Sequence, residues 1–353
     1  MSDDRTRGVD RDAYDDGPVA ALRRIAFLLE RAREDTYKVK AFRAAAATIL
    51  PLSEDDVEAA VEDGSLTDLP GIGASTAGVI RDAVNGVLPD RLAKLEQEHG
   101  GPLTVGGHDL RAALRGDLHS HSDWSDGGSP IEEMAFTAIE LGHDYLVLTD
   151  HSPRLTVAHG LSAERLTKQL TVVDAVNQHL GGGFTLLKGI EVDILDDGEL
   201  DQSDELLARL DLRVASVHSK LAMDSAAMTR RMIAAVKNPR TNVLGHCTGR
   251  LVTGGRGTRA QSQFDAKAVF EACAEHDVAV EINSRPERRD PPRKLLELAR
   301  DLGCLFSIDS DAHAPGQLDF QVYGCERAEQ VGIEADRIVN TWPRERLLAW
   351  AND

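Results

Sequence analysis

Two histidines at alternate positions open the stretch of this sequence that carries the most chemical information. His119 and His121 follow Gly116, and a polar loop through Asp126 comes next, before a helical pattern begins at Ile131. Because side chains of a β-strand alternate between its two faces, both imidazoles point to the same side. Imidazole and carboxylate together bind divalent ions such as zinc, manganese or iron. The stretch therefore predicts metal ligands on a strand and its following loop; a surface strand with a chance His-x-His pattern is the alternative.

The elements that must position these side chains alternate between strand and helix from Arg115 onward. Apolar runs predict seven strands, at residues 116–121, 145–151, 185–194, 212–218, 242–246, 278–283 and 305–309. Helical patterns lie between most of them, at residues 130–141, 163–180, 225–236, 264–276 and 292–302. Seven strands that alternate with helices predict an α/β fold, a distorted (β/α) barrel and not the eight-fold kind.

Metal-binding side chains recur at the carboxyl ends of these predicted strands. Besides the first pair, the residues at such positions are His151, Glu191, His218, His246, Asp311 and His313. The carboxyl ends of barrel strands meet at the rim where barrel enzymes carry their active sites. A lone histidine is more often structural, but this recurrence at one end favours a shared site. The other histidines, five in helices or linkers and His159 in a loop, are interpreted as structural or exposed.

The first hundred residues predict short helices joined by a distinctive turn. Apolar spacing indicates helices at residues 19–29 and 38–50, and the sequence Pro70-Gly71-Ile72-Gly73 follows. Such a turn is typical of a helix-hairpin-helix, because its glycines allow tight geometry and the next helix offers backbone N–H groups to a phosphate. A simple helix–helix turn and a solvated basic helix face are the alternatives. The expected DNA contacts are Gly71, Ile72, Gly73, Ser75, Lys38, Lys40 and Arg43.

Composition limits the class of protein. The chain has 353 residues, a formal net charge of −19 and four scattered cysteines, with no Cys-x-x-Cys pair. This pattern argues against disulfides and thiolate zinc sites and predicts a reducing, cytoplasmic location. So acidic a protein cannot bind nucleic acid through bulk charge. We expect a disordered acidic tail at 1–17, a helix-hairpin-helix domain at 18–99, a linker at 100–114 and a barrel at 115–353, with no segment that spans a membrane.

The N-terminal segments Tyr37–Ala45 and Gly64–Gly73 resemble, in order, the small N-terminal domain of family X DNA polymerases. The position of that family's lyase lysine is Val79 here, so Schiff-base lyase chemistry is not expected. The linker of about fifteen residues before the histidine motif is far too short for a polymerase palm, which excludes polymerase activity.

The later motifs resemble a PHP (polymerase and histidinol phosphatase) domain, in the variant found at the C-terminus of bacterial family X polymerases. The matching motifs are Thr149–Pro153, Ser216–Lys220, Glu281–Asn283 and Asp309–His313. The resemblance implies a distorted (β/α)7 PHP barrel and three divalent metal ions per chain, of manganese, zinc or iron. The implied ligand sets are His119, His121, Glu191 and Asp311; Asp126, His151 and His313; and His218 and His246, with Glu191 bridging. Asp117 and Asp150 are expected to orient imidazoles, or else to cap turns.

The implied chemistry is hydrolysis of a phosphate ester, because clustered divalent ions acidify a bound water and clamp phosphoryl oxygens. Arg250, Arg288 and Lys220 are candidate phosphate contacts, with surface salt bridges as the alternative. We expect a DNA end-processing hydrolase, either a 3′–5′ exonuclease or a 3′-phosphatase, that binds DNA through the hairpin domain. A small-molecule phosphomonoesterase of the histidinol-phosphatase type is the second hypothesis, and a non-catalytic DNA-binding accessory protein is the third.

Overall fold

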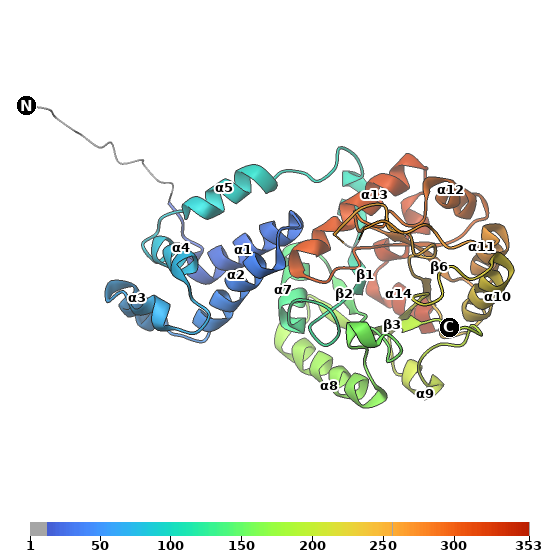
Figure 1. Ribbon diagram of the computed structural model, residues 1–353, viewed down its shortest axis with the longest axis horizontal. Helices are drawn as coiled ribbons and strands as arrows, with labels where there is room; N and C mark the ends of the chain where they lie inside the picture. The colour runs from blue at the N-terminus through green and yellow to red at the C-terminus, as the bar shows by residue number, and fades with distance from the viewer. Residues whose placement is uncertain (1–12, 256, 353) are drawn as a thin grey trace, which may run out of the picture. The chain divides into compact units, whose positions relative to one another are not determined.

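The structure, a computed structural model, describes residues 13–255 and 257–352 (Figure 1). The chain divides into two compact units, one ending at Pro102 and the other beginning at Leu103. Ordered structure begins before the expected end of the tail at residue 17, because Ala13 forms a β-bridge with Val87 and Tyr14 N–H donates to the Gly86 carbonyl at 3.0 Å. The rest of the expected tail, residues 1–12, lies outside the described residues.

The first unit is helical. Its elements are α1 (Gly17–Arg31), α2 (Thr36–Ile49), α3 (Glu54–Glu62), a 3-10 turn η1 (Ser65–Asp68), α4 (Ala74–Val84) and α5 (Asp90–His99). Helix α1 buries Leu22, Ile25 and Leu29, at the spacing of one helical face. It packs against α2, α4 and α5, so it is the central helix of this unit. Ser53 caps α3, since it accepts a hydrogen bond from Asp56 N–H.

In the described part of the chain, the second unit contains a parallel seven-stranded sheet in the order β1 to β7. Its strands are β1 (Gly116–Ser120), β2 (Tyr145–Leu148), β3 (Thr185–Asp193), β4 (Leu212–Ser216), β5 (Val243–Leu244), β6 (Ala279–Asn283) and β7 (Phe306–Asp309). The sheet nearly closes on itself, because Ser120 forms a parallel bridge with Ala312 and His121 N–H donates to the Ala312 carbonyl at 2.8 Å. The predicted (β/α)7 barrel is therefore confirmed. His119 lies within β1, whereas His121, His151, His218 and His246 follow the ends of their strands.

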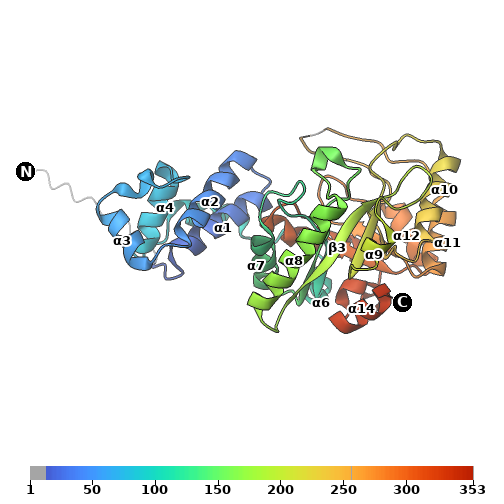
Figure 2. The same ribbon diagram turned by 90° about the horizontal axis from the view of Figure 1, so that it is seen from below.

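Helices cover the outside of the sheet, as Figure 2 shows for α8 alongside β3. They are α6 (His108–Ala113), α7 (Ile131–Glu140), α8 (Ala163–Leu180), α9 (Asp204–Leu207), α10 (Ser225–Val236), α11 (Ala266–Glu275), α12 (Arg293–Asp301), α13 (Gln321–Gln330) and α14 (Arg344–Asn352). Short 3-10 turns occur at η2 (Thr156–Ala158), η3 (Pro315–Phe320), η4 (Ala335–Arg337) and η5 (Val339–Thr341). Side-chain caps define several helix starts: Ser162, Asp224 and Asp265 each accept a backbone N–H three residues later.

The segment expected to be a linker, residues 100–114, is mostly part of the second unit. It contains α6, and its preceding turn is bound by α13: the N–H groups of Val105 and Gly106 donate to Glu326 at 3.2 and 3.1 Å, and Gly107 N–H donates to Glu329 at 2.5 Å. Local sequence patterns do not reveal these contacts, because the partner residues lie about 220 positions later in the chain.

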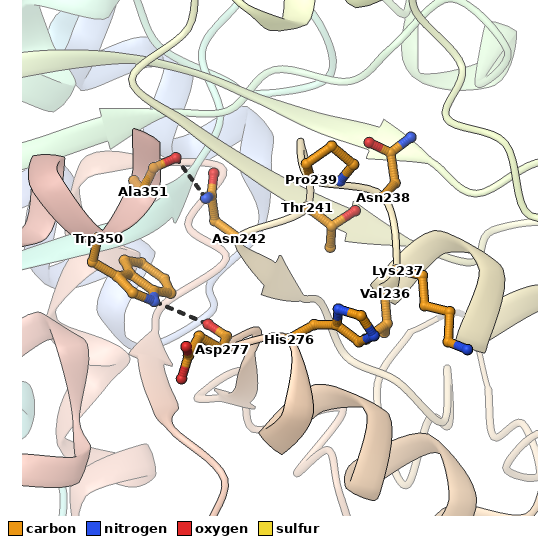
Figure 3. A pocket seen from close by; sticks show the side chains of 10 residues that line it. All are labelled: Val236, Lys237, Asn238, Pro239, Thr241, Asn242, His276, Asp277, Trp350 and Ala351. Carbon is orange, nitrogen blue, oxygen red and sulfur yellow. Dashed lines mark hydrogen bonds between the residues drawn. The ribbon is translucent and has the colours of Figure 1, made fainter. Parts of the chain in front are cut away.

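A cavity of about 380 Å³ lies at the amino ends of the strands, and none of the nine predicted metal ligands lines it (Figure 3). Residues that line this cavity form hydrogen bonds with the C-terminal helix α14. Trp350 Nε1 donates to the Asp277 carbonyl at 2.9 Å, and Asn242 donates to the Ala351 carbonyl at 2.9 Å. Buried Arg213 also donates to Ala351, at 2.9 Å. These contacts stabilise the closed end of the barrel and leave the carboxyl ends for chemistry.

His143 predicts a pH-dependent term in the stability of this unit. Burial, with a smaller effect of Arg111, lowers the pKa of His143 from 6.5 to about 3. The unfolded chain then binds a proton that the folded chain does not, so stability falls as pH drops from 6.5 toward 3. Relative to wild type, His143→Gln should gain about 2 kcal/mol between pH 7.5 and pH 5, measured by urea unfolding of the full chain. A constant difference at the two pH values would contradict this.

Candidate metal centre

The side chains predicted as metal ligands lie together at the carboxyl ends of the strands. Donor atoms within 4.8 Å of one another form four overlapping groups: His121, Asp126, His151 and His313; His119, Glu191 and His246; His119, His121 and Asp311; and His151, Glu191 and His218. All nine predicted positions are present in these groups. The clusters could bind metal ions; how many they bind, and which metal, stays a prediction.

Glu191 is the centre of the arrangement. Its Oε1 is 2.8 Å from Nε2 of His246 and 3.2 Å from Nε2 of His218. Its Oε2 is 2.9 Å from Nδ1 of His151 and 3.3 Å from Nε2 of His119. One carboxylate on β3 thus contacts imidazoles that follow or end four other strands, which suits a bridging ligand.

Asp126 marks the more open side of the cluster. Its Oδ1 lies 3.4 Å from Nε2 of His151 and 3.4 Å from Nε2 of His313, and its side chain is 31% exposed, against 1% for Glu191. His121 lies between this group and the deeper one, with Nε2 at 3.4 Å from Asp311 Oδ1 and Nδ1 at 4.0 Å from Asp126 Oδ1. The structure therefore links His121 with two of the three ligand sets that the resemblance implies.

Unsatisfied ring nitrogens show that the donor set fits metal ions. Among the described residues, these buried atoms make no hydrogen bond of suitable geometry, although three of them lie 2.9–3.3 Å from Glu191: His119 Nε2, both nitrogens of His121, His151 Nδ1, His218 Nε2 and His246 Nδ1. A buried polar atom without a partner costs about 1–3 kcal/mol. Divalent ions accept the lone pairs of neutral imidazoles and of carboxylates, so ligation would satisfy these atoms.

The electrostatics of the cluster are strongly coupled. Burial alone would raise the pKa of Glu191, but His119, His218 and His151 hold it well below its usual value. Burial alone would lower the pKa of His119, but the carboxylates of Glu191, Glu281 and Asp311 raise it well above its usual value. Acid and imidazole thus stabilise each other's charge in this buried cluster.

Two carboxylates that the sequence did not assign orient the imidazoles. Glu281 Oε1 is 2.6 Å from His119 Nδ1, and its other oxygen accepts the His246 backbone N–H. Asp193 Oδ1 is 3.0 Å from His218 Nδ1. Such contacts fix the tautomer that leaves Nε2 for a metal. Each residue was detectable as an acid within an apolar run, and Asp193 stands two positions after Glu191, on the same face of the strand.

Asp117 and Asp150 do not orient imidazoles, which corrects that expectation. Asp117 accepts the backbone N–H groups of His119 and Ser310 at 3.2 Å. Burial and the neighbouring Asp309 raise its pKa to about 8. Asp150 accepts from the backbone N–H and hydroxyl of Ser122 and from other side chains of this region. Both acids therefore hold backbone segments that carry predicted ligands. This agrees with the alternative expectation that they cap turns.

Arg288 lies at the metal centre, and Arg250 and Lys220 do not. Arg288 Nε is 3.1 Å from Asp311 Oδ2, and its side chain is 13% exposed. Arg250 instead donates to the carbonyls of Arg288 and Arg289, so it stabilises the backbone of the loop that follows β6. Lys220 pairs with Asp196 at 2.5 Å, with its side chain 61% exposed. Neither Arg250 nor Lys220 lines the cavity that opens over the cluster, so the structure does not support their assignment as phosphate contacts.

Arg285 was missed by the sequence reasoning. Its Nη1 lies 3.3 Å from the Asp311 carbonyl and 2.9 Å from Nδ1 of His313, which itself lies 2.9 Å from that carbonyl. With the proton on His313 Nδ1, both groups donate to the Asp311 carbonyl, and Nε2 of His313 faces Asp126. Nothing in the local sequence distinguishes Arg285 from its neighbouring arginines.

A cavity of about 630 Å³ opens over the cluster. The residues that line it are Asp126, His151, Leu155, Val157, Ala158, Glu191, His218, Leu251, Thr258, Arg259, Arg285, Arg288, Asp311 and His313. Its lining combines acids and imidazoles with guanidinium groups and apolar side chains. A volume between about 300 and 1,000 Å³ is typical of small-ligand sites.

The structure supports only part of the predicted DNA contacts in the first unit. Gly71 has a φ of +76°, a conformation that favours glycine, and Gly73 begins α4. Ser75 is exposed, but Ile72 is buried and packs inside the unit. Gly73 N–H already donates to Thr76 Oγ1 at 3.0 Å.

The basic residues of α2 are a weaker surface than expected. Arg43 pairs with Glu30 at 2.8 Å, and its side chain is only 13% exposed. Lys38 pairs with Glu34 at 2.7 Å. Lys40 is exposed. The side chains of Ile72 and Arg43 were expected to contact DNA. Instead, Ile72 is buried and Arg43 pairs with Glu30 inside the unit, so neither side chain is available for that contact.

Comparison with known protein families identifies both units. Residues 117–285 match the PHP domain family, and residues 17–86 match a helix-hairpin-helix domain family. The DNA polymerase/3′-5′ exonuclease PolX of Bacillus subtilis is 38% identical over 227 residues, which cover 64% of this chain and 39% of that relative. The chain thus spans well under half of the length of that relative.

Two further proteins are similar over 65% and 63% of this chain. A probable phosphatase of Aeromonas hydrophila is 32% identical over 244 residues, which cover 65% of this chain and 91% of the relative. The solved histidinol phosphate phosphatase of Lactococcus lactis, a complex with zinc, L-histidinol and phosphate, is 17% identical with a TM-score of 0.46; the match covers 63% of this chain and 95% of that one.

No helix among the described residues has the length and apolar character that a membrane span requires.

Glu281 allows a test of the metal centre that leaves all nine predicted ligands in place. Glu281→Gln keeps the shape of the side chain but weakens the acceptor for His119 Nδ1–H. Loss of such a contact costs about 10–100-fold in metal affinity. We expect that loss for zinc or manganese, measured by competition with a chelating dye, while Glu205→Gln, an exposed acid on α9, keeps wild-type affinity. Equal affinity of the two variants would contradict the role of Glu281.

Proposed function

This chain belongs to the family of PHP-domain metal-dependent phosphoesterases, and we propose that its substrates are DNA ends, which it trims as a 3′–5′ exonuclease or a 3′-phosphatase. The observation that carries the proposal is the combination of a complete set of predicted metal ligands with a helix-hairpin-helix unit on the same chain. The similarity to a polymerase/exonuclease over 227 residues supports the same substrate class.

The residues of the chain have separable roles in this proposal. When bound, divalent ions supply an acidified water and charge neutralisation for phosphoryl oxygens. The nine predicted ligands hold those ions, and Glu281 and Asp193 keep the imidazoles oriented. Arg288 and Arg285 present guanidinium donors to the phosphate, since both line the cavity beside Asp311. Leu155 and Val157 form an apolar wall that accommodates the sugar or base.

The helix-hairpin-helix unit supplies DNA affinity without a large positive charge. The N-terminal turn of α4 carries backbone N–H groups that attract a phosphate, and Ser75 is exposed there. This mode of binding suits a chain with a net charge of −19, because it is local and needs few lysines.

A small-molecule phosphomonoesterase of the histidinol-phosphatase type is the second candidate. The specific observation in its favour is that the probable phosphatase of Aeromonas hydrophila aligns over 91% of its own length. A cavity of about 630 Å³ also accommodates a compact phosphate monoester.

The two candidates predict different substrates for the manganese-loaded protein. We expect degradation of a single-stranded oligonucleotide, resolved on a denaturing gel, and little hydrolysis of histidinol phosphate, measured as released phosphate. Glu191→Gln, which alters the central ligand, should abolish any genuine activity and serves as the control for contaminating nucleases. An intact oligonucleotide together with rapid cleavage of histidinol phosphate would instead establish the second candidate.

The hairpin unit can be tested by adding charge where the phosphate is expected. Ser75→Glu places a carboxylate in the first turn of α4, where it suits the helix dipole and should not unfold the unit. We expect about tenfold weaker binding of a DNA duplex with a single-stranded end, measured by fluorescence anisotropy. Gln97 is an exposed residue of α5, so Gln97→Glu adds the same charge elsewhere in the unit. This control variant should bind DNA with wild-type affinity. Identical affinities for both variants would exclude this turn as the contact.

A further inference from the structure

A second, smaller cavity adjoins the cavity over the metal centre. It measures about 180 Å³ and is lined by Leu251, Thr253, Gly254, Gly255, Arg285, Glu287 and Arg288. Three of these residues, Leu251, Arg285 and Arg288, also line the larger cavity. The two guanidinium groups therefore form a shared wall, with the predicted metal ligands on one side and a loop with two glycines on the other. At 180 Å³ the second cavity is below the usual range for a whole ligand and suits one group of a larger molecule.

The shared wall carries two guanidinium groups that are held in place. Arg288 donates to Asp311 Oδ2 through Nε at 3.1 Å. Arg285 is fixed by the Asp311 carbonyl, and its Nε lies 3.7 Å from Glu287 Oε2. Side chains of both arginines are only 12–13% exposed, so little conformational freedom is lost when they bind a ligand. Fixed, planar donors of this kind favour phosphate.

The loop on the far side leaves space for such a group. Val252 N–H donates to the Glu287 carbonyl at 2.7 Å, which ties the loop to the segment that carries both arginines. A Cβ on Gly255 would meet nothing within 4 Å. Glu287 also lines the cavity, and its carboxylate offsets part of the charge of Arg285. Glu287 and Asp311 both lie close to the two guanidinium groups, so it is the directed N–H donors of Arg285 and Arg288, and not an excess of positive charge, that would bind a phosphate.

We propose that this second cavity binds the phosphate next to the scissile one in a polynucleotide strand. The inference rests on the proposed function and extends it, because it assigns the site a substrate with at least two consecutive phosphates. While the metal centre holds the scissile phosphate, Arg285 and Arg288 contact both phosphates across the shared wall. A compact monoester fills only the larger cavity, so the second cavity favours a nucleic-acid strand over a small phosphate ester.

Gly255 gives the test, because a side chain fits there and the residue does not line the larger cavity. Gly255→Asp and Gly255→Lys are compared on two manganese-dependent substrates, decathymidylate and the same strand with a neutral methylphosphonate at the linkage before the last. We expect Gly255→Asp to raise KM for decathymidylate about tenfold and Gly255→Lys to lower it several-fold. Both effects should shrink for the methylphosphonate strand and at high salt. Gly183→Asp, at the other end of the barrel, also meets nothing within 4 Å and controls for net charge.

Each outcome decides the proposal. A charge effect at position 255 that depends on the neighbouring phosphate supports the subsite. Equal effects of Gly255→Asp on both strands, or an effect no larger than that of Gly183→Asp, would overturn the subsite while leaving the nuclease function intact. If wild-type protein leaves both strands whole but hydrolyses p-nitrophenyl phosphate, the DNA substrate fails, and the subsite fails with it.

Discussion

The buried carboxylate of Glu191 is the constraint on which the barrel's functional end depends. A charge that is 1% exposed is tolerated only with strong compensation. His119, His151, His218 and His246 provide it at 2.8–3.3 Å, and each comes from a different part of the chain. The carboxyl ends of the strands must therefore converge within a few ångströms. The near closure of the sheet between Ser120 and Ala312 makes that convergence possible.

A further shell of acids and guanidinium groups stabilises this cluster in turn. Glu281 and Asp193 hold imidazoles, while Arg285 and Arg288 compensate the charge of Asp311. The same two arginines line the cavity, so the residues that compensate the charge of a predicted ligand also offer guanidinium donors to a phosphate. A chain with a net charge of −19 thus carries arginine donors where a phosphate ester would bind.

Much of the fold and of the candidate site was accessible from the sequence. The strand and helix patterns, the ends of α8 and α10, and the positions of the histidines depend on periodicity and local spacing, which the chain itself encodes. The arginines were not accessible. Arg250 and Lys220 carry the same charge as Arg285 and Arg288. Only the tertiary structure shows that Arg250 binds loop carbonyls and that Lys220 forms a surface ion pair. Arg285 and Arg288 line the cavity instead.

The sequence alone determined which side chains could bind metal, because imidazoles and carboxylates at strand ends are chemically specific and their faces follow from a period of two. Only the tertiary structure decided which other side chains contact these predicted ligands. Glu281 reaches His119 across 162 positions, and Arg43 is turned inward by Glu30. Such pairings depend on distances through space between segments far apart in the chain, and local sequence patterns hold no information about those distances.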